Sequence, residues 1–145
     1  MIVPPFTMTL RQATEADLPV ILKMMLCTPW EKTDYLTQQL ERRNIIVAEE
    51  AEKILGFIVW NREFASLPFV WLVVVAPPYR RRGTASKLFE YVEDKCSGAR
   101  LYSSTNESHE AMHRFLARRG YRHAGTVDID PGDLEIFYCI DLPER

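Results

Sequence analysis

The chain has 145 residues, of which 47% are hydrophobic and 26% charged, and its formal net charge is −2 at pH 7. This length and composition exclude a disordered chain and predict one globular domain over residues 1–145 with a core of its own. The small net charge argues against nucleic acids and anionic membranes as partners, so we expect neither.

The three cysteines, Cys27, Cys96 and Cys139, are far apart and odd in number. Their spacing is not that of a metal site, and a disulfide framework is not expected at this length, so reduced thiols are favoured. Met1–Phe6 lacks the basic region of a secretory signal. The uncharged stretch Phe64–Pro78 is too short to span a bilayer. We therefore expect a cytoplasmic protein without a metal.

The first predicted element is a strand over Thr7–Gln12. A helix follows, because apolar residues recur on one face at helical spacing. Two caps for this helix stay open: Asp17 leaves Pro19 in the first turn, whereas Thr14 forms a capping-box-like pair with Asp17. A second helix is predicted over about Thr33–Arg43. The residues on the apolar face of the first helix are Leu18, Ile21, Leu22, Met25 and Leu26.

The middle of the chain predicts a hairpin and a central helix. Apolar, β-branched runs at Ile45–Glu49 and Ile54–Trp60 predict two antiparallel strands. A loop over about Asn61–Pro68 then leads to a strand at Phe69–Val75. The helix that follows is expected to end near Gly98, a left-handed cap. Its predicted buried face carries Ala85, Leu88, Phe89, Val92 and Cys96.

The last third predicts a strand at Arg100–Ser104, a helix over about His109–Arg119 that stops at Gly120, and two final strands. Those strands cover Tyr121–Val127 and Leu134–Ile140, with a Pro-Gly turn between them. The order βααβββαβαββ predicts a mixed α/β sheet with helices on both sides. The last helix is expected to bury Met112, Phe115 and Leu116.

The run Arg80–Ala85 stands between the predicted central strand and its helix. Unpaired N–H groups at a helix start and the positive end of the helix dipole favour a phosphate ligand. Gly83 and Ala85 allow close approach to the backbone. No Walker loop is present, because no Gly-Lys-Ser/Thr follows. Two alternatives stay open, an ordinary solvated turn and a fragment of a basic surface that binds nucleic acid.

The segment Val75–Ala85 resembles motif A of the GNAT acyltransferase superfamily, Val-x-Pro-x-Tyr-(Gln/Arg)-x-x-Gly-x-(Gly/Ala), at each defined position. Leu10–Leu18 resembles the family's opening strand and capped helix, and Phe115–Tyr121 its closing helix-Gly-aromatic segment. The resemblance covers nearly the whole chain. It implies an α/β fold with a mixed, mostly antiparallel sheet of about seven strands flanked by about four helices.

The resemblance also implies an activity. The chain is expected to be an N-acetyltransferase that moves an acetyl group from acetyl-CoA to a primary amine by direct attack in a ternary complex. The acceptor is a small-molecule amine or an amine of a peptide or protein. Residues implied to contact the cofactor are Val73, Val74, Val75, Arg80, Arg81, Arg82, Gly83, Thr84, Ala85, Ser86, Asn106 and His109.

The chain departs from the family at two positions that often carry the acid and base. Ser104 stands where a Glu is frequent, and Leu116 where a Tyr is frequent. We therefore predict His109, Ser104 and Tyr121 as catalytic candidates. The helix start is expected to lower the pKa of His109, although a solvated surface histidine is the alternative. Further candidates are Tyr102, Ser103 and Tyr138.

These departures also motivate a rival function, a module that binds coenzyme A without turnover. Several acidic and aromatic residues have two interpretations. The acidic side chains either form solvated turns or attract a cationic amine, and the aromatic ones either pack in the core or line an acceptor pocket. Many relatives dimerise, which leaves a homodimer as an open alternative. The residues concerned are Asp128, Asp130, Asp133, Glu135, Glu31, Asp34, Trp30, Tyr35 and Trp60.

Overall fold

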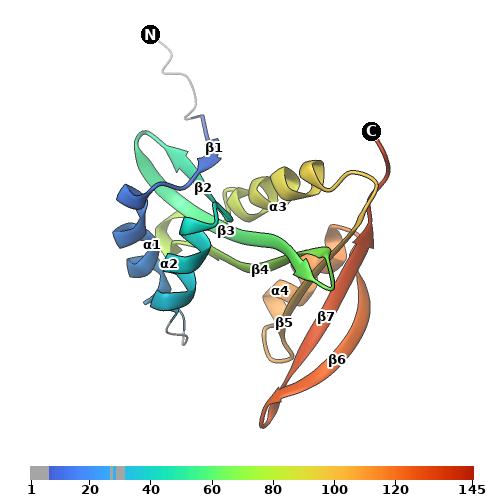
Figure 1. Cartoon of the computed structure of the whole chain (residues 1–145). Helices are drawn as coiled ribbons and strands as arrows, with labels where there is room; N and C mark the ends of the chain where they lie inside the picture. The colour runs from blue at the N-terminus through green and yellow to red at the C-terminus, as the bar shows by residue number, and fades with distance from the viewer. Residues whose placement is uncertain (1–6, 27, 29–31) are drawn as a thin grey trace. The chain divides into compact units, whose positions relative to one another are not determined.

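The computed structural model describes residues 7–26, 28 and 32–145 (Figure 1). The predictions made above for Cys27, Trp30 and Glu31 lie outside the described residues. The elements, in chain order, are β1 (Thr9–Gln12), a 3₁₀ turn (Glu15–Asp17), α1 (Leu18–Met25), α2 (Thr33–Glu41), β2 (Ile45–Glu50), β3 (Lys53–Phe64), β4 (Leu67–Val75), a second 3₁₀ turn (Pro77–Tyr79), α3 (Thr84–Lys95), β5 (Arg100–Asn106), α4 (Glu110–Arg118), β6 (Arg122–Asp130) and β7 (Asp133–Asp141).

The seven strands of the described chain are hydrogen-bonded in the order β1-β2-β3-β4-β5-β7-β6. β4 and β5 run parallel, whereas β1–β2, β2–β3, β5–β7 and β6–β7 are antiparallel. The predicted order of elements and the predicted mixed, mostly antiparallel sheet with four helices are therefore confirmed.

Contacts within the chain define two compact units. The first comprises the described residues of Met1–Trp60 together with Leu72–Val92, and the second comprises Asn61–Trp71 together with Glu93–Arg145. The prediction of one domain stays a prediction.

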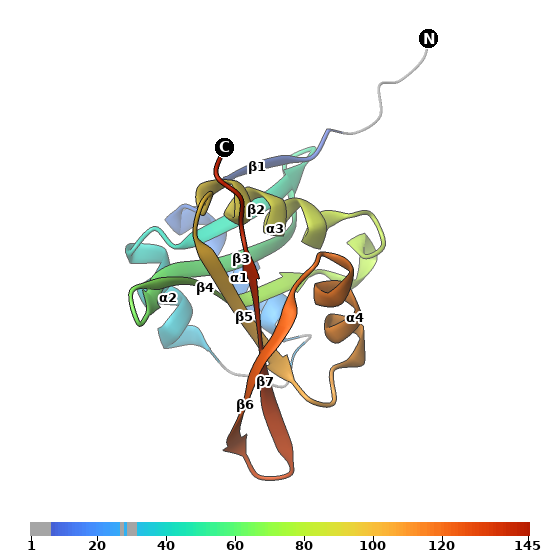
Figure 2. The same cartoon turned by 90° about the vertical axis from the view of Figure 1, so that its right-hand side faces the viewer.

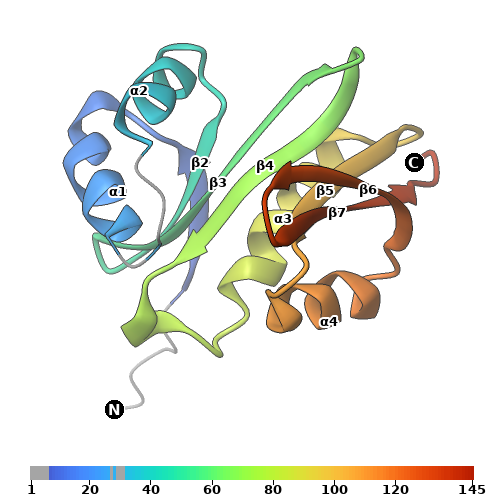
Figure 3. The same ribbon diagram turned by 90° about the horizontal axis from the view of Figure 1, so that it is seen from below.

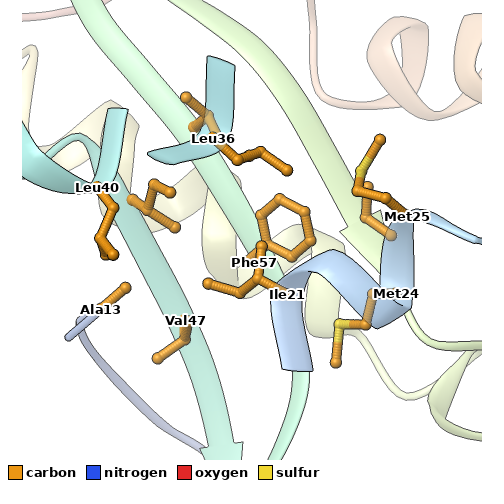
Figure 4. Packing of buried hydrophobic residues seen from close by; sticks show 11 residues of the cluster. Ala13, Ile21, Met24, Met25, Leu36, Leu40, Val47 and Phe57 are labelled. Atoms are coloured by element: carbon orange, nitrogen blue, oxygen red, sulfur yellow. The ribbon is translucent and has the colours of Figure 1, made fainter. Parts of the chain in front are cut away.

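In the first unit, α1 and α2 cover one side of β2 and β3, and α3 lies on the other side, as Figure 3 shows. Helices on both sides of the sheet were predicted. Apolar side chains of α1 pack with α2 against β2 and β3 (Figure 4). Ile21, Leu36, Val47 and Phe57 are fully buried at the centre of this cluster. Burial of each such side chain contributes about 1.5–3 kcal/mol. The cluster therefore stabilises β2, β3 and the end of β4 that carries Val73–Val75. Leu26, which was predicted to lie on the apolar face of the first helix, follows the end of α1 and is 83% exposed, so that part of the prediction is wrong.

The structure shows how Thr14 and Asp17, the two candidate caps of the first helix, are arranged. The Asp17 carboxylate accepts hydrogen bonds from the Thr14 N–H at 2.7 Å and from the Thr14 hydroxyl at 3.2 Å. It also accepts two hydrogen bonds from the Arg11 guanidinium, at 2.7 and 2.9 Å. The capping pair of Thr14 with Asp17 therefore forms, and it caps the 3₁₀ turn Glu15–Asp17. Asp17 is itself the N-cap residue of α1, with Pro19 in the first turn of that helix. Arg11 is the main cause of a lowered pKa for Asp17.

We expect Asp17→Asn to lower the free energy of unfolding at pH 7 by about 1–3 kcal/mol. Because the folded-state pKa of Asp17 is lowered, its stabilisation is present above the unfolded value near 3.8 and is lost as the pH falls through the folded value. Urea unfolding between pH 2 and pH 7 measures this, with the exposed Glu15→Gln as the control. Equal acid sensitivity in wild type and Asp17→Asn would contradict the assignment.

In the second unit, β7 lies between β5 and β6, and the β6–β7 hairpin is the longest in this unit (Figure 2). Ser103 pairs with Tyr138, and Ser104 pairs with Phe137. Gly132 has φ = +87° in the turn of the hairpin, as a Pro-Gly turn demands. Leu116 is the one fully buried residue of α4, whereas Met112 and Phe115, which were also predicted to be buried, are only half-buried.

The predicted loop over about Asn61–Pro68 is wrong. β3 continues to Phe64, and β4 already begins at Leu67. Only Ala65 and Ser66 remain as a two-residue turn, with φ of 52° and 64°, the positive values that a type I′ hairpin turn requires. Aromatic packing explains the longer strands, because the ring of Phe64 lies 4.9 Å from that of Phe69. Smaller boundary differences place the end of α2 at Glu41, of β5 at Asn106 and of β6 at Asp130.

Candidate functional site

The loop between β4 and α3 has the backbone shape expected of an anion site. After the 3₁₀ turn Pro77–Tyr79, Arg81 adopts φ = +65° and Gly83 φ = +78°. The first hydrogen bond of α3 runs from the Lys87 N–H to the Gly83 carbonyl at 3.0 Å. The N–H groups of Thr84, Ala85 and Ser86 therefore lie at the open end of the helix, where the helix dipole favours negative charge.

Space is available beside these N–H groups. A Cβ atom added to Gly83 would meet nothing within 4 Å. The hydroxyl of Thr84 is buried and has no hydrogen-bond partner among the described residues. Open space, unpaired donors and the positive φ of Gly83 fit a diphosphate bound through the main chain.

The three arginines of the loop are not equivalent. Arg80 donates from Nε to the Val75 carbonyl at 3.2 Å. Arg82 forms an ion pair with Glu50, a carboxylate at the end of β2 that is only 8% exposed. Arg81 forms no ion pair within the described chain and is exposed. The arginine that remains available to an anionic ligand is therefore Arg81.

Glu50 had no predicted role, but it holds Arg82 and thereby one side of the loop. We expect Glu50→Ala to weaken acetyl-CoA binding about two- to fivefold, since a partly exposed ion pair contributes about 0.5–1 kcal/mol. Titration calorimetry measures the affinity. The control is Glu52→Ala, an exposed glutamate in the neighbouring turn. Equal affinities for both variants would show that the ion pair does not shape the loop.

The predicted Val73–Val75 backbone and the loop Arg80–Ser86 belong to the first unit. Close packing of β3 on β4 marks this stretch, because a Cβ added to Gly56 would lie only 2.6 Å from the Val74 carbonyl oxygen. Gly56 is thus needed where β3 and β4 approach each other, next to the part of β4 predicted to bind the cofactor. The other predicted site residues belong to the second unit.

Ser104, Asn106 and His109 lie along the end of β5 and the start of α4. The Ser104 hydroxyl donates to the Glu135 carboxylate at 3.0 Å. His109 is exposed and is the N-cap residue of α4, with its Nδ1 3.3 Å from the Thr105 hydroxyl. The His109 N–H donates to the Asn106 carbonyl at 3.0 Å. His109 therefore sits at a helix start, as the sequence predicted.

Tyr121 has a different environment from the other catalytic candidates. It is 5% exposed, and its hydroxyl donates to the Glu93 carboxylate at 2.8 Å. Arg119 also binds Glu93. Burial first, and then the charge of Glu93, raise the pKa of Tyr121 above its usual value. These contacts favour a structural role for Tyr121 over its predicted catalytic one.

The further candidates Ser103 and Tyr138 also have partners. The buried Ser103 hydroxyl donates to the Val70 carbonyl at 3.1 Å. The Tyr138 hydroxyl lies 2.6 Å from Nδ1 of His113. Nε2 of His113 lies 3.0 Å from the Asn106 and Glu107 carbonyls, so it carries a proton that they accept. His113 thus ties α4 to β7.

Three other observations concern the metal, membrane and cysteine expectations stated above. Within the residues that the structure places, no three His, Cys, Asp or Glu side chains gather in a way that could hold a metal ion. None of the helices in this part of the chain has the length and apolar character needed to cross a membrane. Cys96 and Cys139 are free and buried, and burial raises the pKa of the Cys96 thiol. A raised pKa disfavours the reactive thiolate.

Comparison with known proteins shows which family the chain matches. Residues 15–121 match the family described as "Acetyltransferase (GNAT) family". A curated relative, the S-alkylcysteine N-acetyltransferase of Bacillus subtilis (strain 168), is 27% identical over 93% of this chain and 90% of its own length.

Solved structures show the same fold. A GNAT-family acetyltransferase from Bacillus cereus ATCC 10987 superimposes with a TM-score of 0.83 at 27% identity, over 94% of this chain and 98% of its own. The yncA protein of Salmonella typhimurium, determined with its cofactor acetyl-CoA, gives a TM-score of 0.74 at 20% identity, over 95% of each chain.

Proposed function

The chain belongs to the GNAT acetyltransferase family, and on that premise we propose that the loop Arg80–Ser86 holds the diphosphate of acetyl-CoA for N-acetyl transfer. The family uses acetyl-CoA as its donor and an amine as its acceptor, so the chain is an acetyl-CoA-dependent N-acetyltransferase. The observation that supports the proposed location of the diphosphate is the open space at Gly83 beside the start of α3.

Bound acetyl-CoA supplies a thioester, whose acetyl carbon accepts the amine and whose thiolate leaves. The chain's own part is to bind and position. The N–H groups of Gly83–Ser86 hold the diphosphate, and Arg81 adds a cation. The Val73–Val75 backbone is proposed to pair with the pantetheine arm as an added strand does. Positioning of donor and amine lowers the barrier by up to about 7–11 kcal/mol in ideal systems, which favours direct attack in a ternary complex.

We propose His109 as the residue that takes the proton from the acceptor amine, through water. It is exposed and is the N-cap residue of α4, where the positive end of the helix dipole disfavours a further positive charge. Ser104 is proposed to act through Glu135, its hydrogen-bond partner. Asn106 is proposed to contact the cofactor through its side chain, because its carbonyl is already bonded to His113.

We expect His109→Ala to lower kcat about 10²-fold at neutral pH and to leave the acetyl-CoA affinity nearly unchanged, since general base catalysis contributes about 10²–10⁴-fold. The measurement is the pH–rate profile of both proteins. Superimposable profiles would show that His109 does not move the proton. His123→Ala, an exposed histidine on β6, is the matched control.

The function itself is tested by thiol release from acetyl-CoA with a panel of primary amines. Turnover with at least one amine is expected. Binding of acetyl-CoA without thiol release under every condition would favour the rival, a module that binds coenzyme A without turnover. S-alkylcysteines belong in the panel, because the Bacillus subtilis relative is named for them. We propose a small-molecule amine of this kind as the acceptor.

Two more proposals and one prediction concern the whole molecule. We propose one domain over residues 1–145, because the family match spans both units. We propose a cytoplasmic location, which the free thiols of Cys96 and Cys139 favour. A homodimer stays a prediction that light scattering tests.

A further inference from the structure

The second unit carries an aromatic surface on the side of its sheet that faces away from α4. α4 contacts the side of β7 that bears Tyr138, since His113 reaches the Tyr138 hydroxyl. Side chains alternate along a strand, and Ser103 pairs with Tyr138. The side chains of Tyr102, Ser104 and Phe137 therefore lie on the opposite face.

Five rings meet on this face. The ring of Phe64 lies 5.1 Å from Tyr102 and 5.9 Å from Phe137. The ring of Phe69 lies 4.1 Å from that of Trp71. Phe69 is buried beneath the others, whereas Trp71 is 40% exposed. We call Phe64, Phe69, Trp71, Tyr102 and Phe137 the aromatic cluster. Exposed aromatic area of this kind is a typical binding surface for apolar groups.

One carboxylate borders the aromatic cluster. Glu135 on β7 is paired with Asn106 on β5, and its carboxylate accepts a hydrogen bond from the Ser104 hydroxyl. Ser104 is itself paired with Phe137 of the aromatic cluster. Among the described residues no salt bridge joins Glu135 to a cation. The cations of these strands, Arg100 and Arg122, bind Asp141 instead. Asp141 is about 20 Å further along β7, at about 3.3 Å per residue.

We propose that this face is the acceptor site, where Glu135 binds the ammonium group and the aromatic cluster binds an apolar side chain. The occupant is a primary amine that carries an aromatic, alkyl or thioether group. The half-buried carboxylate of Glu135, which has no cation in a salt bridge among the described residues, matches the charge of an ammonium group. The partly exposed rings beside it match an apolar substituent. Ser104 is a positioning residue that orients Glu135. This proposal rests on the proposed function, because it names the acceptor of that reaction.

The test compares 2-phenylethylamine with ethanolamine. Both are primary amines with an aminoethyl unit, which carries a phenyl ring in the first and a hydroxyl group in the second. Wild type is expected to use 2-phenylethylamine at least tenfold better in kcat/KM. Glu135→Gln is expected to raise KM for 2-phenylethylamine about tenfold with KM for acetyl-CoA unchanged. Asp128→Asn, which removes an exposed carboxylate from the same hairpin, is the matched control and is expected to resemble wild type. Trp71→Ala is expected to lower kcat/KM for 2-phenylethylamine more than kcat/KM for ethanolamine, and so to reduce the preference for the aromatic amine.

Equal KM values for Glu135→Gln and Asp128→Asn, or equal use of the two amines by wild type, would overturn the proposal while the transferase activity stands. Absence of thiol release with every amine would instead contradict the proposed function. In that case calorimetry of 2-phenylethylamine, with coenzyme A present, still tests the site. Weaker binding by Glu135→Gln than by Asp128→Asn supports the proposal, and equal binding overturns it. Thermal unfolding of each variant establishes that it is folded.

Discussion

Replacing Gly83 by tryptophan is expected to weaken acetyl-CoA binding at least 100-fold while the protein stays folded. The indole would enter the open space where a Cβ meets no other atom, which is the space assigned to the diphosphate. It would also block the N–H groups of Thr84, Ala85 and Ser86, whose charge-assisted hydrogen bonds contribute about 1.5–3 kcal/mol each. Titration calorimetry with acetyl-CoA measures the loss.

The control for this experiment must share the backbone strain of Gly83. Gly132 meets that condition, since it has φ = +87° and an added Cβ would meet nothing within 4 Å, but it lies in the β6–β7 turn. Gly132→Trp is expected to keep the wild-type affinity for acetyl-CoA. Full affinity in a folded Gly83→Trp variant would contradict the location of the diphosphate.

Replacing Glu93 by alanine is expected to cost about 2–4 kcal/mol of unfolding free energy. The Glu93 side chain is 14% exposed and binds both Arg119 and the buried Tyr121 hydroxyl. Its loss removes one carboxylate partner from a guanidinium and from a hydroxyl in a site that is largely closed to water. Urea unfolding measures the change. Glu90→Ala, an exposed glutamate on the same helix, is expected to stay within about 0.5 kcal/mol of wild type.

The same cluster distinguishes the two roles of Tyr121. Tyr121→Phe is expected to lose about 1 kcal/mol of stability with unchanged kcat, because one hydrogen bond to Glu93 is removed. A large fall in kcat with unchanged stability would instead restore Tyr121 as a catalytic residue.

The features that local sequence determines were predictable. The loop Arg80–Ser86 was identified because strand, turn and helix start follow one another directly along the chain. The cap of the first helix was limited to Thr14 or Asp17 for the same reason. In the structure Thr14 pairs with Asp17 to cap the 3₁₀ turn, and Asp17 is the N-cap residue of α1. Hydrophobic periodicity also gave the correct order of helices and strands, since each periodic stretch is long enough to distinguish helix from strand.

Contacts between distant segments were not predictable. The pairing of Ser104 with Glu135 depends on the register of β5 against β7, which a single sequence does not specify. The ion pair of Arg82 with Glu50 joins residues 32 positions apart. The Ala65–Ser66 turn was missed because the strands around it are extended by aromatic packing across β3, β4 and β5, which joins residues from separate segments.

The central claim is that main-chain nitrogens at the start of α3 bind the diphosphate of acetyl-CoA. Amide NMR spectra recorded during titration with acetyl-CoA test it most directly. The account predicts that the largest shift changes fall on the N–H signals of Gly83, Thr84, Ala85 and Ser86. A saturated complex in which these four signals keep their positions, while others move, would contradict it.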